Sequence, residues 1–204
     1  MKLLTTFSTF TLIALIGFPT VGTALELEKY MHVAKGGVVS TGRGLTVTNS
    51  ELETARTEEF SIGFQLTPAL RFSVPFSSYT VDTRGSNDEV LPFGMLNVET
   101  VGMMLTLSGR GKWAPFIGLG TNFYDFTEQF ATPANMQNTF GAEASTGLGV
   151  RLIDSIFEVA QLNGSLGYQF SFLRPRVSVP ARPDVDVLWL NRHSITFRLE
   201  ILGL

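Results

Sequence analysis

Apolar and small polar residues alternate along the C-terminal half of the chain. In residues 139–152 and 162–172, most alternate side chains are apolar, and the intervening positions hold mainly Gly, Ser, Asn and Gln. Successive side chains of a β-strand point to opposite faces, so this period predicts two strands. Each run has about 10 or more residues, the length with which a tilted strand crosses a bilayer. The pattern therefore predicts strands with one face against lipid.

The same alternation predicts eight strands in all. We place them at residues 28–39, 59–66, 70–79, 98–107, 113–126, 139–152, 156–172 and 193–202. Pro75 lies inside the third strand, where proline removes a ladder donor, and a β-bulge could absorb it.

The expected connections alternate in length. Short turns fall at residues 67–69, 108–112 and 153–155, and long loops at 40–58, 82–97, 127–138 and 173–192. Outer-membrane barrels have short periplasmic turns, long extracellular loops and an even strand count. Lipid offers no hydrogen bonds, so the sheet must close on itself. We predict an all-β protein, an eight-stranded antiparallel up-and-down transmembrane β-barrel.

The N-terminus has the features of a secretory signal. Lys2 is followed by an apolar stretch over residues 12–18 and by the small residues Gly22, Thr23 and Ala24. We expect a signal peptide over residues 1–24 and the barrel domain over 25–204, with a retained anchor helix as the alternative. The chain would then pass through the periplasm to the cell outer membrane.

Composition supports a membrane barrel over a soluble one. Charged residues make up 16% of the chain, against about 25% in soluble domains, and cysteine is absent. The net charge of −3 argues against a nucleic-acid partner. A soluble barrel of the lipocalin type would also alternate, but its water-facing positions would be rich in Lys, Glu and Asp. Here those positions hold Gly, Ser, Thr, Asn and Gln.

One strand carries a family resemblance. Residues 113–126 include Pro115, Gly118, Gly120 and Asn122, and this spacing resembles the hallmark strand of the OmpW family of small outer-membrane barrels. The order of motifs from about residue 60 to 172 is also similar. The resemblance implies an eight-stranded monomer with a narrow apolar passage for small hydrophobic compounds.

Charged residues share the polar face of the predicted strands. They form an expected lumen-lining network of Glu59, Arg71, Glu143, Arg151, Arg198 and Glu200. Unpaired buried charge is costly, so we expect these groups to pair, with Glu143 bound to one of the arginines. The network is either a constriction that gates solutes or a plug that fills a barrel too narrow to conduct.

The loops and strand ends supply further candidates, each with a simpler alternative. Lipopolysaccharide phosphates could bind the arginines of the last loop, which otherwise are merely solvated: Arg174, Arg176, Arg182 and Arg192. A hydrophobic access site for solutes, or simple loop packing, could be formed by Phe93, Met95, Phe130 and Met136. Aromatic girdles at the membrane interfaces are expected from Tyr79, Trp113, Phe126 and Trp189.

Catalysis has little support in the sequence. The two histidines are His32 and His193, and His193 is followed by Ser194, which a strand would direct to the opposite face. We predict no catalytic residues, no metal and no cofactor. The expected function is passage of small hydrophobic solutes. The alternatives are a non-conducting structural or adhesive barrel and, third, a lipid-modifying enzyme. Expected partners are outer-membrane lipid, lipopolysaccharide, the barrel-insertion machinery and the solutes.

Overall fold

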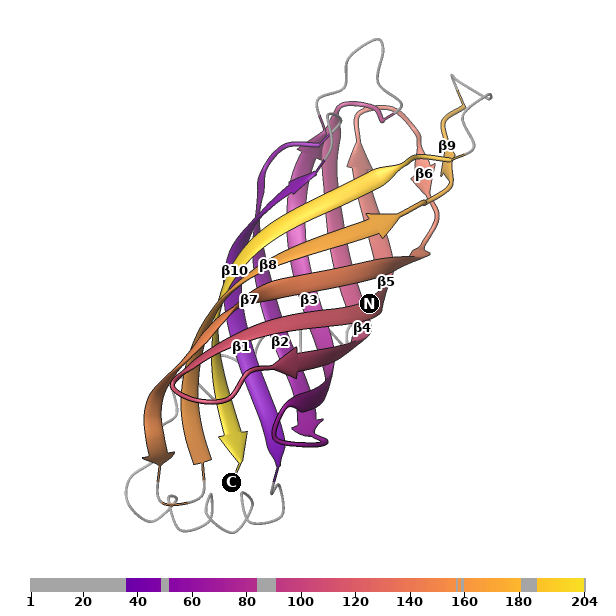
Figure 1. Ribbon diagram of the computed structural model, residues 1–204. Coiled ribbons are helices and arrows are strands. Elements are labelled where there is room, and N and C mark those ends of the chain that lie inside the picture. Colours follow the sequence, from indigo (N-terminus) through magenta and orange to yellow (C-terminus); the bar gives the residue numbers. More distant parts are fainter. Residues whose placement is uncertain are drawn as a thin grey trace, which may run out of the picture.

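Eight long antiparallel strands close into a barrel (Figure 1). The computed structural model describes residues 36–48, 52–83, 91–156, 158, 160–180 and 187–203. The wall consists of β1 (Gly37–Thr48), β2 (Ala55–Gln65), β3 (Leu70–Thr83), β4 (Gly94–Ser108), β5 (Trp113–Phe130), β7 (Thr139–Ile156), β8 (Ala160–Leu173) and β10 (Leu190–Gly203). Each strand pairs with the next along the chain, and β1 closes the barrel against β10. The predicted fold class is confirmed.

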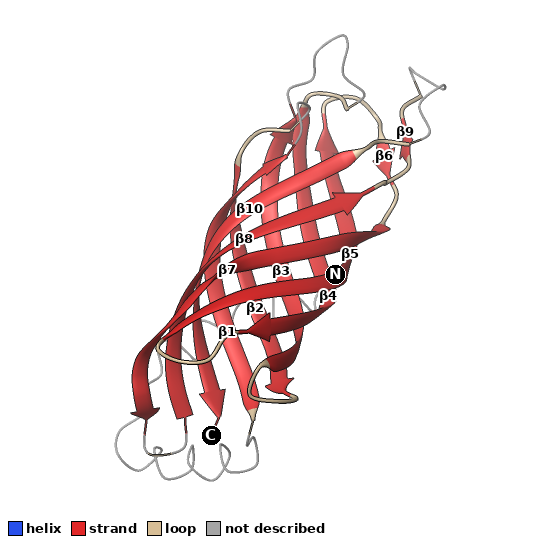
Figure 2. Cartoon of the chain, viewed as in Figure 1, coloured by secondary structure: helices blue, strands red, loops and turns tan. Residues whose placement is uncertain are grey.

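Two short strands lie outside the wall, between long loops. They are β6 (Asn135–Met136) and β9 (Val177–Ser178), which pair with each other at the end of the barrel that carries the long loops (Figure 2). We call this the outer end and the end with the short turns the inner end. Within the described residues, no helix is long and apolar enough to cross a membrane.

The predicted position of the first strand is wrong. β1 begins at Gly37 and includes residues 40–48, for which the sequence predicts a loop, while residues 28–35 lie outside the described residues. Glycines weaken the alternation in this stretch, and the barrel requires at least one of them. A Cβ on Gly44 would lie 2.3 Å from the backbone oxygen of Ile195 in β10. The signal-peptide prediction over residues 1–24 also lies outside the described residues.

Two local predictions in the other strands are also wrong. Asp154 and Ser155 belong to β7 instead of a turn, and the register with β8 shifts there. No bulge occurs at Pro75, because the pairing of β3 with β4 has the same register at Ser73 and Phe76. Val74 and Pro75 have no paired residue on β4. The missing N–H of Pro75 is therefore tolerated without a change of strand register.

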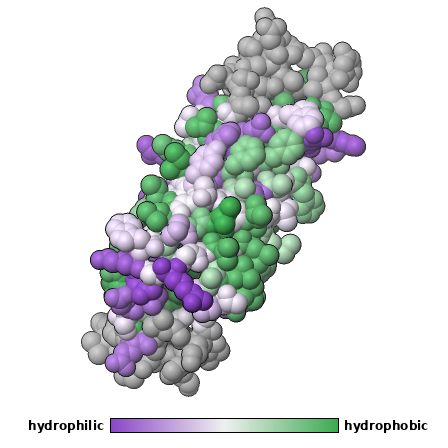
Figure 3. Space-filling model, viewed as in Figure 1, coloured by the Kyte–Doolittle hydropathy of each residue, from purple (hydrophilic) through white to green (hydrophobic). Residues whose placement is uncertain are grey.

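The inner and middle parts of the wall are apolar outside and polar inside. Ile117, Leu166 and Phe197 are 55%, 57% and 53% exposed on the outward face. Apolar side chains form a broad green area on the face seen in Figure 3. Such an exposed belt on a closed barrel is suited to contact with acyl chains.

Beyond this belt, toward the outer end, the two faces of β3, β4 and β5 exchange character, whereas β1 keeps Leu45 and Val47 outside and Thr46 inside. On β3 the apolar outward series ends at Phe76, after which Ser78 and Thr80 are exposed while Tyr79 and Val81 are buried inside. The same inversion occurs on the outer side of Val101 in β4 and of Phe123 in β5. The inward apolar residues there are Leu96, Val98, Tyr124 and Phe126. This part of the wall therefore has a polar outside and an apolar inside, the distribution expected of a barrel standing in water.

The inward residues of this region form one hydrophobic cluster, which we call the outer core. It fills the outer end of the barrel with Leu52, Ala55, Tyr79, Val81, Leu91, Leu96, Val98, Tyr124, Phe126, Met136, Leu173, Val177, Val179, Leu188 and Leu190. Tyr79 and Phe126 are buried here, so the expectation that they belong to an aromatic girdle is wrong. Trp113 and Trp189 are exposed.

Candidate functional site: the barrel interior

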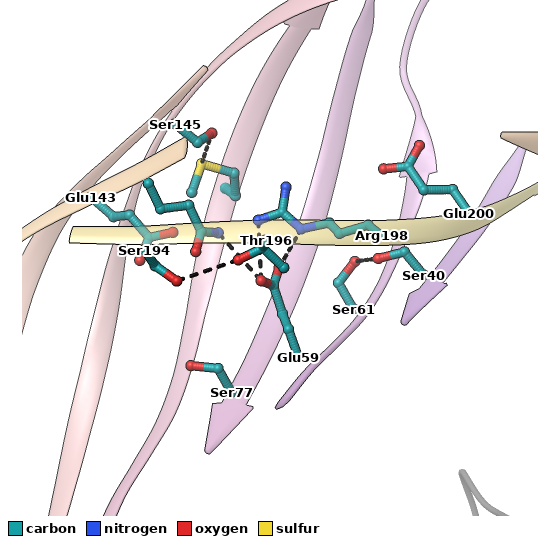
Figure 4. A network of polar contacts seen from close by, with 12 residues as sticks. Ser40, Glu59, Ser61, Ser77, Glu143, Ser145, Ser194, Thr196, Arg198 and Glu200 are labelled. Carbon is teal, nitrogen blue, oxygen red and sulfur yellow. Dashed lines mark hydrogen bonds and ion pairs between the residues drawn. The ribbon is translucent and has the colours of Figure 1, made fainter. Parts of the chain in front are cut away.

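A buried ion pair lies inside the barrel, over Gly42 of β1. Arg198 of β10 reaches Glu59 of β2 with two nitrogens, Nε at 2.8 Å from Oε1 and Nη2 at 3.1 Å from Oε2 (Figure 4). The side chains are only 10% and 5% exposed. Gln169 of β8 donates to the same Glu59 carboxylate at 3.5 Å. All three residues take the inward parity of their strands, so the wall directs them to one point.

A second pair lies closer to the inner end. Arg71 Nη1 of β3 is 2.9 Å from Glu200 Oε2 of β10, and these side chains are 19% and 13% exposed. Arg151 takes part in neither pair and binds Asp154 at 3.2 Å near the end of β7. Four of the six predicted lumen residues thus form two ion pairs across the interior, and Arg151 lies apart from them.

Glu143 is buried as expected, but the prediction that it pairs with one of those arginines is wrong. Asn122 Nδ2 donates to Glu143 Oε2, and Ser171 Oγ donates to the same oxygen at 3.1 Å. No ion pair to Glu143 is found within the described part of the chain. Arg198 also points into the barrel, but it is already bound to Glu59. Neutral donors therefore satisfy this carboxyl group.

Arg192 is inside the barrel, so its predicted contact with lipopolysaccharide is wrong. It is buried in β10 with the same parity as Ser194 and Thr196, and its guanidinium lies 4.9 Å from the ring centre of Tyr79. Its Nε and Nη1 have no hydrogen-bond partner among the described residues. Parity alone could have placed Arg192 inside, had β10 been extended back to Leu190.

The remaining loop candidates do not form a common site. Arg174 and Arg176 are exposed, and Arg182 lies outside the described residues. Phe93 and Met95 are exposed, whereas Met136 belongs to the outer core and Phe130 packs against it. Two of the four residues of the expected hydrophobic access site are therefore exposed and two are packed at the outer core. For Met136 and Phe130, the alternative of loop packing fits the structure better than an access site.

Two cavities lie below the outer core. A vestibule of about 680 Å³ at the inner end is lined by residues of the short turns, and a chamber of about 40 Å³ lies in the middle. Arg71, Glu200 and Phe116 line both, so these side chains separate the two spaces. Sequence reasoning missed Phe116, although its parity on β5 is that of Gly118 and Asn122.

Phe116 fits inside because its register partner Gly147 on β7, and Gly167 beside it on β8, have no side chains. Its ring atom Cζ is 2.6 Å from where a Cβ on Gly147 would lie, and 3.1 Å from the corresponding point on Gly167. Side chains therefore fill the interior at three successive levels. From the inner end these are Phe116 with the Arg71–Glu200 pair, the Glu59–Arg198 pair, and the outer core.

Groups that could support catalysis or metal binding are sparse in this interior. His193 is exposed on the outward face, and its Nδ1 lies 2.5 Å from the hydroxyl oxygen of Tyr168. Ser194 is buried on the opposite face, as the alternation predicts. His32 lies outside the described residues. Within the described ranges, no three His, Asp or Glu side chains come together as a metal site.

Comparison with known proteins identifies the fold alone. No protein-family model matches the chain, and no curated protein matches it. The crystal structure of Neisserial surface protein A superposes with a TM-score of 0.60 at 13% identity, covering 82% of this chain and 97% of that one. OprG of Pseudomonas aeruginosa gives 0.56 at 14%, covering 84% and 97%. The solid-state NMR structure of AlkL gives 0.55 at 11%, covering 83% and 92%. The chain has the architecture of eight-stranded outer-membrane barrels.

Proposed function

We propose that this protein is an outer-membrane barrel that is closed to solutes along its axis and acts as a structural or adhesive element of the envelope. One observation carries the proposal: the interior is filled at several successive levels by side chains that are buried and mutually bound. An eight-stranded barrel leaves an interior that side chains can fill. The outer core supports the same idea, because it stiffens the part of the wall that holds the long loops above the membrane.

Passage of small hydrophobic solutes is the second candidate. It is the function implied by the resemblance of residues 113–126 to the OmpW family, and one feature favours it. The lining of the outer end is apolar, and the β6–β9 pair adds Met136 and Val177 to it from two separate loops. If that pair moved aside, an apolar solute would meet an apolar lining. Catalysis has no such observation in its favour, and we propose a protein that is not an enzyme.

Two uptake measurements test the proposal. Planar-bilayer recordings would report ion conduction, and liposomes loaded with an apolar dye would report passage of hydrophobic solutes. For the closed barrel, we expect neither ion conduction nor dye passage above the level of protein-free membranes. The variant Phe116→Ala/Arg71→Ala/Arg198→Ala removes side chains at two filled levels but leaves the outer core, so we expect it to stay closed as well.

A disulfide across the β6–β9 pair separates the two candidates. Asn135 and Ser178 are register partners, and such residues lie about 4.5–5.5 Å apart, within reach of a disulfide. The chain has no native cysteine, so Asn135→Cys/Ser178→Cys is a clean variant. Dye passage that is lost on oxidation and restored by reduction would establish transport and overturn the closed barrel. The single Asn135→Cys variant is the control.

A further inference from the structure

The outward face of the barrel changes from apolar to polar between two neighbouring register rows. The inner row is apolar on β2, β3, β4, β5 and β7, where it contains Phe60, Phe76, Val101, Phe123 and Phe140. The next row lies two residues further out on these strands. It is polar on β1, β2, β3, β4 and β5, where it contains Arg43, Glu58, Ser78, Glu99 and Asp125. We call the outward face of β2, β3 and β4 beyond this boundary the polar sector.

The apolar belt is shorter below the polar sector than on the other side of the barrel. On β2, β3 and β4 the outward apolar series runs only over residues 60–66, 70–76 and 101–107. On β7 and β8 the outward positions from 140 to 152 and from 162 to 172 include no charged residue. With a rise of about 3.3 Å per residue and a strand tilt of about 40°, the belt is about 15 Å tall on the first three strands and about 25–30 Å on the other two. The apolar band of an outer-membrane barrel is usually about 25 Å tall, so the belt is too short on β2, β3 and β4.

The missing height lies at the outer end of the belt. Leu45 and Val47 on β1 are apolar and exposed, but the register partner of Leu45 on β2 is the exposed Arg56. Thr80 of β3 donates to Asn97 Oδ1 of β4 at 2.7 Å on the same outward face. The belt therefore has a step between β1 and β2, and the wall beyond that step is polar at a level where β1 is still suited to acyl chains.

Charges of both signs lie in the polar sector and beside it. Arg43 of β1 and Glu58 of β2 form an ion pair of 3.3 Å, and their side chains are 83% and 65% exposed. Arg56 adds positive charge on β2, and Asp82 and Glu99 add negative charge on β3 and β4. Charge is unfavourable against acyl chains, whereas water and lipid headgroups solvate both signs. The polar sector is therefore suited to contact with the headgroup layer.

We propose that the polar sector draws the outer leaflet toward the inner end, so that lipid headgroups and water lie about 10 Å deeper along β2, β3 and β4 than along β7 and β8. A bilayer adjusts to a short apolar surface by thinning locally, at a modest cost. A tilt of the whole barrel does not remove the difference, because it moves both edges of the belt together and the belt itself is shorter here. The proposal depends on the outer-membrane location and on neither of the candidate functions above.

Spin labels at single cysteines test the proposal, because the chain has no native cysteine. The two labelled positions must lie at the same level in the membrane. A register row that starts at Thr48 returns to β1 at Val38 after one circuit, so each row shifts along the axis by about one residue per strand. With this correction, the outward Ala142 of β7 lies at about the level of Ser78 of β3. Ser78→Cys and Ala142→Cys are therefore a matched pair of variants.

The depth of each label is measured in phosphatidylcholine liposomes that contain the full-length protein. Collisions with a water-soluble nickel chelate report contact with water, and collisions with dissolved oxygen report contact with acyl chains. We expect the chelate to reach the label at position 78 several-fold more often than the label at position 142, and oxygen to give the opposite order. Equal accessibility of the two labels to the chelate would overturn the proposal. Shielding of position 78 from both reagents, as by a second copy or another protein, would also overturn it.

A charge-free variant tests whether the polar row causes the thinning. Arg43→Leu/Glu58→Leu/Glu99→Leu replaces the charges nearest to Ser78 by apolar side chains, so the chelate accessibility of position 78 should fall toward that of position 142. Unchanged accessibility would overturn the proposal. Arg151→Leu/Asp154→Leu removes an ion pair near the inner end instead and should leave position 78 as accessible as before. Heat-modifiable gel mobility would show that every variant forms a closed barrel.

Discussion

Replacing Arg198 by methionine should destabilise the barrel more than replacing Arg71. Methionine preserves much of the volume but leaves the Glu59 carboxylate without its partner. Removing one partner of a buried ion pair costs about 3–5 kcal/mol, because the other charge stays buried and uncompensated. We expect a cost in this range, because the side chains of Arg198 and Glu59 are only 10% and 5% exposed. Gln169, at 3.5 Å, is too distant to replace Arg198 as the partner of the carboxylate.

The Arg71–Glu200 pair provides the comparison within the same barrel. It has a similar distance, 2.9 Å, but Arg71 and Glu200 line the vestibule, where water can replace a lost partner. We expect Arg71→Met to cost about 1 kcal/mol, in the range of solvent-exposed pairs. The difference between the two substitutions thus measures how strongly the middle of the barrel is sealed from water.

The free energy of unfolding is measured by urea unfolding of the protein in detergent micelles. Gel mobility and the fluorescence of Trp113 and Trp189 report the folded fraction. The double variant Glu59→Gln/Arg198→Met removes both charges and should recover most of the loss, which a double-mutant cycle would show as strong coupling. If Arg198→Met costs no more than Arg71→Met, or if the two changes in the double variant simply add, the reasoning about a sealed ion pair is refuted.

The other predictions concern the two regions of the wall. Leu96→Ala, in the outer core, should cost about 2–5 kcal/mol in urea unfolding, and Leu105→Ala on the lipid face of the same strand should cost less, because lipid can fill the space. Gly147→Ala should reduce the folded fraction on heat-modifiable gels, because its Cβ would lie 2.3 Å from a backbone oxygen of β8, whereas Gly149→Ala, with 3.4 Å of clearance, should fold normally. Leu119→Arg, in the apolar belt, should cost about 2–4 kcal/mol, measured by the same unfolding assay. A loss below 1 kcal/mol would contradict the position of that belt.

Much of the wall can be derived from the sequence because a strand alternates its faces locally. The alternation predicts the outward apolar residues and the inward position of Glu59 and Arg198, and the need to pair every backbone group in lipid predicts closure of the barrel. The structure confirms all three predictions. The inversion at the outer end was present too: apolar parity changes from Phe76 to Tyr79 within one strand. We missed this change and assigned Tyr79 to a girdle, because an aromatic residue near a strand end fits either environment.

The pairing inside the barrel is a property of the tertiary structure. Glu59 and Arg198 are 139 residues apart in the chain, and they meet because closure of the barrel makes both of them register partners of Gly42 on β1. Parity also puts Glu143 and Arg192 inside, but it does not predict their partners. In the structure, Asn122 and Ser171 donate to Glu143, and Arg192 lies over the ring of Tyr79. Alternation is fixed by neighbours along the chain, whereas contacts across a lumen are fixed by how far the closed sheet is sheared.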